Sequence, residues 1–120
     1  MQKSSEIKLS NKVIIIKYNL GSLLKLERTL GHSINAMFAM PLAEYMDRLN
    51  IDFAAAAIVC GAPSDLRLKT EDALNIIQQF CDEGGNLDEI YNTIVKAILA
   101  TGLFTKGVAV EAPASPESNK

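Results

Sequence analysis

The spacing of the apolar residues changes once along the chain, near Tyr18, and this change predicts the fold class. Before it, apolar and polar residues alternate, as in a strand with one buried face. After it, apolar residues recur every three or four positions, which is the period of a helix packed on a core. A chain of 120 residues has room for one domain. The sequence therefore predicts an α+β domain, with an N-terminal two-stranded β-hairpin packed on a bundle of about five α-helices.

The hairpin is expected to bury one defined face. A turn at residues 10–11 pairs Ile7 with Ile14, whereas a turn at residues 11–12 pairs Ile7 with Ile16. Because the two registers differ by two residues, they place the same side chains on the core face. That face holds Ile7, Leu9, Ile14, Ile16 and Tyr18, and the opposite face holds Val13 and Ile15, either exposed or covered by a second element.

Capping and helix-breaking residues divide the rest of the chain into helices. We predict helices over residues 20–30, 33–40, 41–49, 53–60, 71–81 and 87–99, with the break in the second region set by Pro41. The side chains of Asn19, Asp52, Thr70 and Asn86 are placed to accept hydrogen bonds from the first turns. Gly31 lies where a left-handed residue ends the first helix. The apolar stripe of that helix consists of Leu20, Leu23, Leu24, Leu26 and Leu30.

The composition changes after Phe104. Residues 106–120 are rich in Pro, Ala, Ser and Glu, and they hold Val108 and Val110 as their large aliphatic residues. Such a segment buries too little apolar area to offset its ordering entropy. We therefore expect residues 1–105 to form a single domain and residues 106–120 to be a flexible, disordered tail. The alternative is that residues 108–110 add a short strand to the hairpin edge.

Charge and hydropathy exclude several classes of partner. The 12 Lys and Arg residues against 14 Asp and Glu residues leave a net charge of −2, so no nucleic-acid partner is expected. The longest uncharged apolar stretch, residues 53–63, has about half the length of a membrane-spanning helix. The N-terminus lacks the pattern of a signal peptide. Two cysteines without metal-ligand spacing indicate a reducing cytoplasm.

The residues with catalytic potential are few. His32 follows a helix end with no potential metal ligand at suitable spacing, and Cys60 and Cys81 lie on apolar helix faces. A reactive thiolate needs an electropositive, open setting, which neither cysteine is expected to have. The sequence predicts no catalytic, cofactor-binding or metal-binding residue, no cofactor, and no enzyme activity.

One segment has an unusual composition. Residues 36–46 contain three of the four methionines together with two aromatic residues. Methionine is flexible and is used where a surface accepts varied apolar partners, so these side chains are candidates for partner binding. The alternative is that they fill an irregular core around Pro41. The candidates are Met37, Phe38, Met40, Tyr45 and Met46.

The order of these segments resembles that of the small phage tail assembly chaperones, especially those of gene-transfer-agent type. Those chains open with a short hairpin that leads directly into a first helix, here residues 18–31. A hydrophobic, Phe-containing segment and a short alanine-rich helix follow, here residues 33–49 and 52–61. Two terminal helices complete the pattern, so the resemblance covers about residues 6–104.

The resemblance implies a non-enzymatic phage or prophage protein of the host cytoplasm that is absent from the mature virion. Its expected partner is the tape measure protein, a long helical chain that it keeps soluble until the tail tube polymerises; the tail tube protein is a further candidate partner. The alternative is a structural virion component of the tail terminator or head-tail connector type. Open hairpin edges are compatible with a homo-oligomer.

Overall fold

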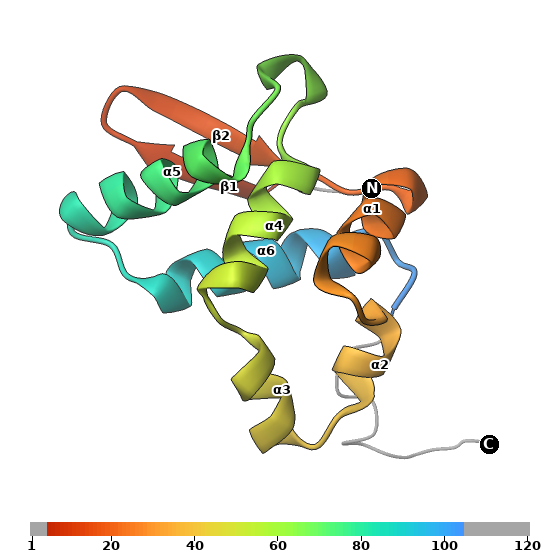
Figure 1. The fold of residues 1–120 in the computed structure, drawn as a ribbon. Helices are drawn as coiled ribbons and strands as arrows, with labels where there is room; N and C mark the ends of the chain where they lie inside the picture. The colour runs from red at the N-terminus through yellow and green to blue at the C-terminus, as the bar shows by residue number, and fades with distance from the viewer. Residues whose placement is uncertain (1–4, 105–120) are drawn as a thin grey trace.

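The computed structural model describes residues 5–104 (Figure 1). Its elements, in chain order, are β1 (Ser5–Leu9), β2 (Lys12–Ile16), α1 (Leu20–Leu30), α2 (Ile34–Ala39), α3 (Leu42–Arg48), α4 (Ile51–Gly61), a 3-10 turn η1 (Ser64–Leu66), α5 (Thr70–Asp82) and α6 (Leu87–Leu99). The predicted α+β class, a hairpin followed by helices, is confirmed. The tail predicted over residues 106–120 and the alternative strand at 108–110 lie outside the described residues.

The hairpin adopts the first of the two predicted registers. Ile7 pairs with Ile14 and Leu9 with Lys12 in an antiparallel ladder, so the turn falls at residues 10–11. The five residues predicted for the core face are all buried. Val13 and Ile15, on the opposite face, are exposed. The alternation of residue types was enough to predict this face because a strand turns its side chains alternately to its two sides.

Helix α4 forms the centre of the core. Figure 1 shows it between α1 and α5, with α6 crossing it, and it contacts all three helices and β2. The four consecutive alanines, residues 54–57, are buried together with Phe53 and Ile58. Small side chains let neighbouring helices approach this one on several sides. The mainly apolar sequence of α4 thus reflects a helix enclosed by other elements.

The end of β2 is joined to the end of α4 by specific contacts. The backbone N–H of Lys17 donates to the carbonyl of Gly61 at 2.9 Å. The hydroxyl of Tyr18 donates to the carbonyl of Ala57 at 2.6 Å. This tyrosine is fully enclosed, and burial raises the pKa of its hydroxyl well above the usual value. Gly61 leaves room for the ring, since a Cβ there would lie 2.6 Å from the Tyr18 ring.

Two predicted helix starts are corrected. The N-cap of α4 is Asn50, whose Oδ1 accepts from the N–H of Phe53 at 2.9 Å, so Asp52 lies in the first turn and does not cap it. The N-cap position of α5 is occupied by Lys69, and Thr70 is the first helical residue. The carboxylate of Asp72 accepts from the N–H of Lys69 at 2.8 Å. The helix start is therefore fixed by a side chain of its first turn that reaches back to the N-cap backbone, and Thr70 does not cap it.

Other helix ends agree with the sequence. Asn19 and Asn86 each form a capping box with the residue three positions further on. Gly31 ends α1 in the left-handed conformation, with φ 81°. The stripe of α1 is narrower than predicted. Its buried members are Leu23 and Leu26, Leu30 is half-buried, and Leu20 and Leu24 are exposed.

Candidate functional site

The residues with catalytic potential, His32, Cys60 and Cys81, lie in different parts of the fold. Among residues 5–104, no group of three or more His, Cys, Asp or Glu side chains could hold a metal ion. His32 is half-buried in the turn after α1, with its Nδ1 3.5 Å from the carbonyl oxygen of Ser33. Cys60 is buried near the end of α4, and Cys81 is half-buried on α5. The two cysteines are free thiols.

The thiol of Cys60 has competing influences. Burial raises its pKa above the ordinary value of a cysteine, while the ammonium group of Lys25 and a hydrogen bond with Thr29 lower it by less. The raised pKa keeps the thiol protonated at neutral pH. Since the thiolate is the nucleophile, this geometry favours an unreactive side chain.

The segment with the unusual composition folds into the α2–α3 hairpin. The side chain of Ser33 caps α2 by accepting from the N–H of Ala36 at 3.0 Å. A second link joins α2 to α1, because the carboxylate of Glu27 accepts from the N–H of Ile34 at 2.8 Å. Pro41 occupies the N-cap position of α3, in agreement with the predicted break. Nothing in the sequence pattern marked Glu27 as the residue that anchors α2 to α1.

Three aromatic rings hold this hairpin to the end of the domain. The rings of Phe38 and Tyr45 are tilted, with centroids 6.0 Å apart. The ring of Phe104, beyond the end of α6, meets Phe38 edge-on at 5.8 Å. Both distances are typical of favourable aromatic pairs. Burial also raises the pKa of the Tyr45 hydroxyl.

The structure divides the five candidate partner-binding residues between core and surface. Met37 is only 1% exposed, and Phe38 and Tyr45 are also buried, so their side chains fill the core in this conformation. Met40 is half-buried, whereas Met46 is 54% exposed. Three of the five candidates, Met37, Phe38 and Tyr45, therefore lie in the core, as the alternative interpretation of this segment predicted. The exposed Met46 is the one available to a partner without a change in the domain.

Helix α3 carries an apolar stripe that is covered on one side only. Leu42, Tyr45, Met46 and Leu49 recur at the spacing of a packed helix face. Tyr45 is buried and Leu49 half-buried, whereas Leu42 is 73% exposed. We call Leu42 and Met46 the α3 apolar face. Ile51, at the start of α4, is also exposed.

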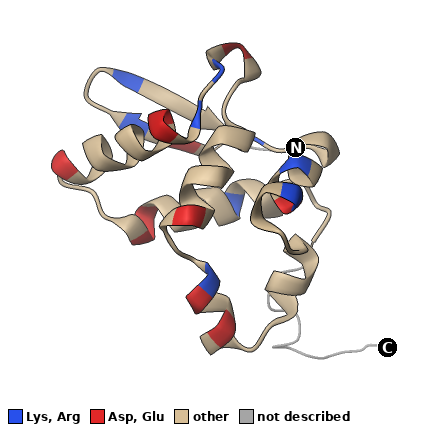
Figure 2. Cartoon of the chain, in the orientation of Figure 1, with Lys and Arg blue, Asp and Glu red and all other residues tan. Residues whose placement is uncertain are grey.

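The position of α3 makes this face accessible. Figure 1 shows α3 projecting from the body of the domain at the end of the α2–α3 hairpin. Figure 2 shows acidic and basic residues on the same short helix, which belong to Glu44, Asp47 and Arg48. Leu42 and Met46 thus form a short apolar strip bordered by charged residues on a projecting helix. Which half of this stripe the domain covers depends on the neighbouring elements that pack against α3.

Comparisons with known proteins add no family assignment. No protein-family model, curated protein or solved structure matches the chain. The similarity to tail assembly chaperones stays a hypothesis carried by the order and apolar pattern of the segments. Within residues 5–104, the structure has no helix with the length and hydrophobicity needed to cross a bilayer.

Proposed function

We propose that the protein is a phage or prophage tail assembly chaperone that binds the tape measure protein in the host cytoplasm. The observation that carries this proposal is the α3 apolar face, an uncovered half of a helix stripe on a projecting element. In this proposal the chain makes and breaks no covalent bond. It shields apolar stripes of the tape measure protein until tail tube subunits cover them, and it is not retained in the virion.

The α3 apolar face suits reversible binding. A helix of the partner can lie along α3 and complete the covering of its stripe, as in other helix-in-groove complexes. Met46 can adapt to different apolar neighbours because its side chain is unbranched and flexible. Burying the exposed parts of Leu42 and Met46 contributes roughly 2–4 kcal/mol before the costs of association are subtracted. Binding of this strength can be displaced when tube subunits compete for the same stripes.

Co-purification with the tape measure protein tests the proposal. The two proteins, encoded by the same phage or prophage, are co-expressed with a tag on the tape measure protein. We expect the chain to be captured and the tape measure protein to move from the insoluble to the soluble fraction. The double variant Leu42→Lys/Met46→Lys should remain folded by circular dichroism but lose capture, because lysine cannot be buried unpaired.

The control is Leu74→Lys, a change of another exposed apolar residue, on α5. This variant should be captured as well as the wild-type chain. Failure of the wild-type chain to bind, or equal capture of the double variant, would contradict the proposal. Mass spectrometry of purified virions distinguishes a tail assembly chaperone, which should be absent, from a structural virion component, which should be present. Recovery of the chain there at the level of a structural subunit would instead indicate a tail terminator or head-tail connector.

A further inference from the structure

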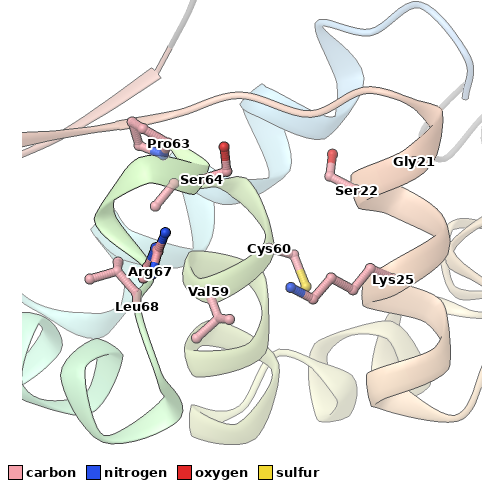
Figure 3. Close-up of a pocket in the computed structure, with 10 residues that line it drawn as sticks. Gly21, Ser22, Lys25, Val59, Cys60, Pro63, Ser64, Arg67 and Leu68 are labelled. Carbon is pink, nitrogen blue, oxygen red and sulfur yellow. The ribbon is translucent and has the colours of Figure 1, made fainter.

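A cleft of about 280 Å³ lies between α1 and the segment that joins α4 to α5. Figure 3 shows Lys25 extending from α1 toward Cys60 on α4. Arg67 lines the cleft from the connecting segment, near Ser64 in the same view. Two cationic side chains from different elements therefore line one small cavity. The α3 apolar face lies on another element, so this site does not depend on the proposed function.

Within residues 5–104, no carboxylate neutralises either cation. In the described range 5–104, the ammonium of Lys25 and the guanidinium of Arg67 have no ion-pair partner, and no carboxylate lines the cleft. Two positive charges near walls of low dielectric constant create a positive potential in the cleft. A bound anion would lower that potential and accept charge-assisted hydrogen bonds. The hydroxyl of Ser64, on the same wall as Arg67, is a further donor.

The backbone at Arg67 supports a role for its side chain. Among residues 5–104 it is the one non-glycine residue with a positive φ, at 51°. Its N–H donates to the carbonyl of Ser64 at 3.1 Å and closes η1. Glycine or asparagine would adopt this left-handed conformation with less strain. Strained residues of this kind cluster at ligand sites, and here the strained residue supplies one of the two cations.

Apolar side chains form part of the remaining lining of the cleft, which also includes Ser22. Val59, Leu68 and Pro63 line it beside the thiol of Cys60. The volume lies near the lower limit for small-molecule pockets, about 300 Å³, so a ligand of a few heavy atoms fits. We propose that this cleft binds an oxyanion, a carboxylate or a phosphate, carried on a short apolar stem. Lys25 and Arg67 hold the charged head group, and the stem lies on Val59 and Leu68.

Titrations of the full chain followed by ¹H–¹⁵N NMR test this proposal. Four probes are added at constant ionic strength: butanoate, butyl phosphate, the neutral analogue butanamide, and inorganic phosphate. We expect saturable shifts of the amides of Lys25, Ser64 and Leu68 with butanoate or butyl phosphate. Whichever of these two probes binds more tightly identifies the preferred head group, carboxylate or phosphate. Butanamide, which lacks the charge, and inorganic phosphate, which lacks the stem, should bind at least tenfold more weakly.

Charge-removing variants show whether the cations are responsible. Lys25→Gln and Arg67→Asn should each weaken binding about tenfold, since one charge-assisted hydrogen bond contributes roughly that factor. Asparagine is chosen because it tolerates the left-handed conformation at this position. Lys96→Gln, a change of an exposed cation on α6, is the matched control and should bind like the wild-type chain.

Several results would overturn the proposal. They are the absence of saturable shifts with both charged probes, binding of butanamide equal to that of butanoate, and unchanged affinity in both charge variants. Equal affinity for inorganic phosphate and butyl phosphate would overturn the assignment of the apolar walls to a stem.

Discussion

At the scale of single residues, Gly61 and Tyr18 fit closely against each other. Alanine normally stabilises a helix interior by up to about 1 kcal/mol relative to glycine. At Gly61 the added Cβ would meet the ring of Tyr18 at 2.6 Å. That ring cannot move freely, because it is buried and its hydroxyl is bonded to the Ala57 carbonyl. Replacing Gly61 with alanine should therefore destabilise the protein, although this change usually stabilises a helix.

We predict that Gly61→Ala destabilises the protein by about 1–3 kcal/mol, the usual cost of overpacking a core. Urea unfolding followed by circular dichroism measures the change. The matched control is Gly21→Ala, because a Cβ at Gly21 has its nearest neighbour, Asn19 Oδ1, at 3.4 Å. That variant should be as stable as the wild type or slightly more so. A Gly61→Ala protein of unchanged or higher stability would show that the Tyr18 ring has room to move.

Sequence could not anticipate this contact or the corrected helix starts. A glycine near the end of an alanine-rich helix is an ordinary helix-stop signal, and the ring that it accommodates belongs to Tyr18, just after β2 and more than forty residues earlier in the chain. The predicted cap of α4, Asp52, and the observed cap, Asn50, lie only two residues apart. Both residue types cap helices well, so only the position of the first turn distinguishes them.

At the scale of elements, Glu83 fastens the hairpin to α5. Its carboxylate accepts from the backbone N–H of Ser10 at 2.8 Å and from the Ser10 hydroxyl at 2.6 Å. The side-chain amide of Gln79 strengthens this link. It donates to Oδ1 of Asn11 in the hairpin turn at 2.9 Å and to the Glu83 carboxylate at 3.0 Å. These hydrogen bonds lower the pKa of the Glu83 carboxyl below its usual value, with Gln79 and Ser10 as the main causes.

We predict a pH-dependent effect of Glu83→Gln. A carboxyl whose pKa is lowered on folding stabilises the fold above its unfolded-state pKa, about 4.3, and this contribution is lost as the pH falls through the folded-state pKa. The variant should therefore have a lower melting temperature than the wild type at pH 7, and the difference should shrink at about pH 3. Thermal unfolding followed by circular dichroism measures both values.

Asp82→Asn is the control for this prediction. The Asp82 carboxylate accepts from Gln78 of the same helix at 2.8 Å, so its loss leaves the link to the hairpin intact. A melting-temperature difference for Glu83→Gln that is the same at both pH values would contradict the role assigned to the carboxylate.

In the α2–α3 hairpin, the sequence predicted the elements but not which of their side chains are buried. Residue spacing predicted both short helices and the break at Pro41. It left open whether the methionine-rich segment is core or surface, and the structure contains both. The answer depends on which neighbours cover each face, and those neighbours include Phe104, far away in sequence.

At the scale of the whole molecule, the hairpin and the helices share one core. Helix α6 contacts both strands and α4, and Ile94 lies on its buried face with 0% exposure. The sequence predicted that face because its isoleucines recur every four residues at positions 90, 94 and 98. Periodicity therefore predicted the core face of α6, although it could not predict which elements would cover it.

We predict that Ile94→Ala destabilises the protein by about 2–5 kcal/mol, through lost apolar burial and the cavity left behind. Urea unfolding provides the measurement. Leu20→Ala, at an exposed position of α1, should change the stability by no more than about 0.5 kcal/mol. If the two variants lost similar stability, the assignment of Ile94 to the shared core would be wrong.

The edge-on contact between Phe104 and Phe38 has a practical consequence for work on this protein. It brings the last described residue next to α2, whose Phe38 also packs on Tyr45 of α3. A fluorophore, affinity handle or fused domain attached shortly after residue 104 would therefore be tethered next to the α2–α3 hairpin, which carries Leu42 and Met46 and which the proposed partner helix would occupy. Attachment ahead of Ser5, at the hairpin side of Figure 1, leaves those side chains unobstructed.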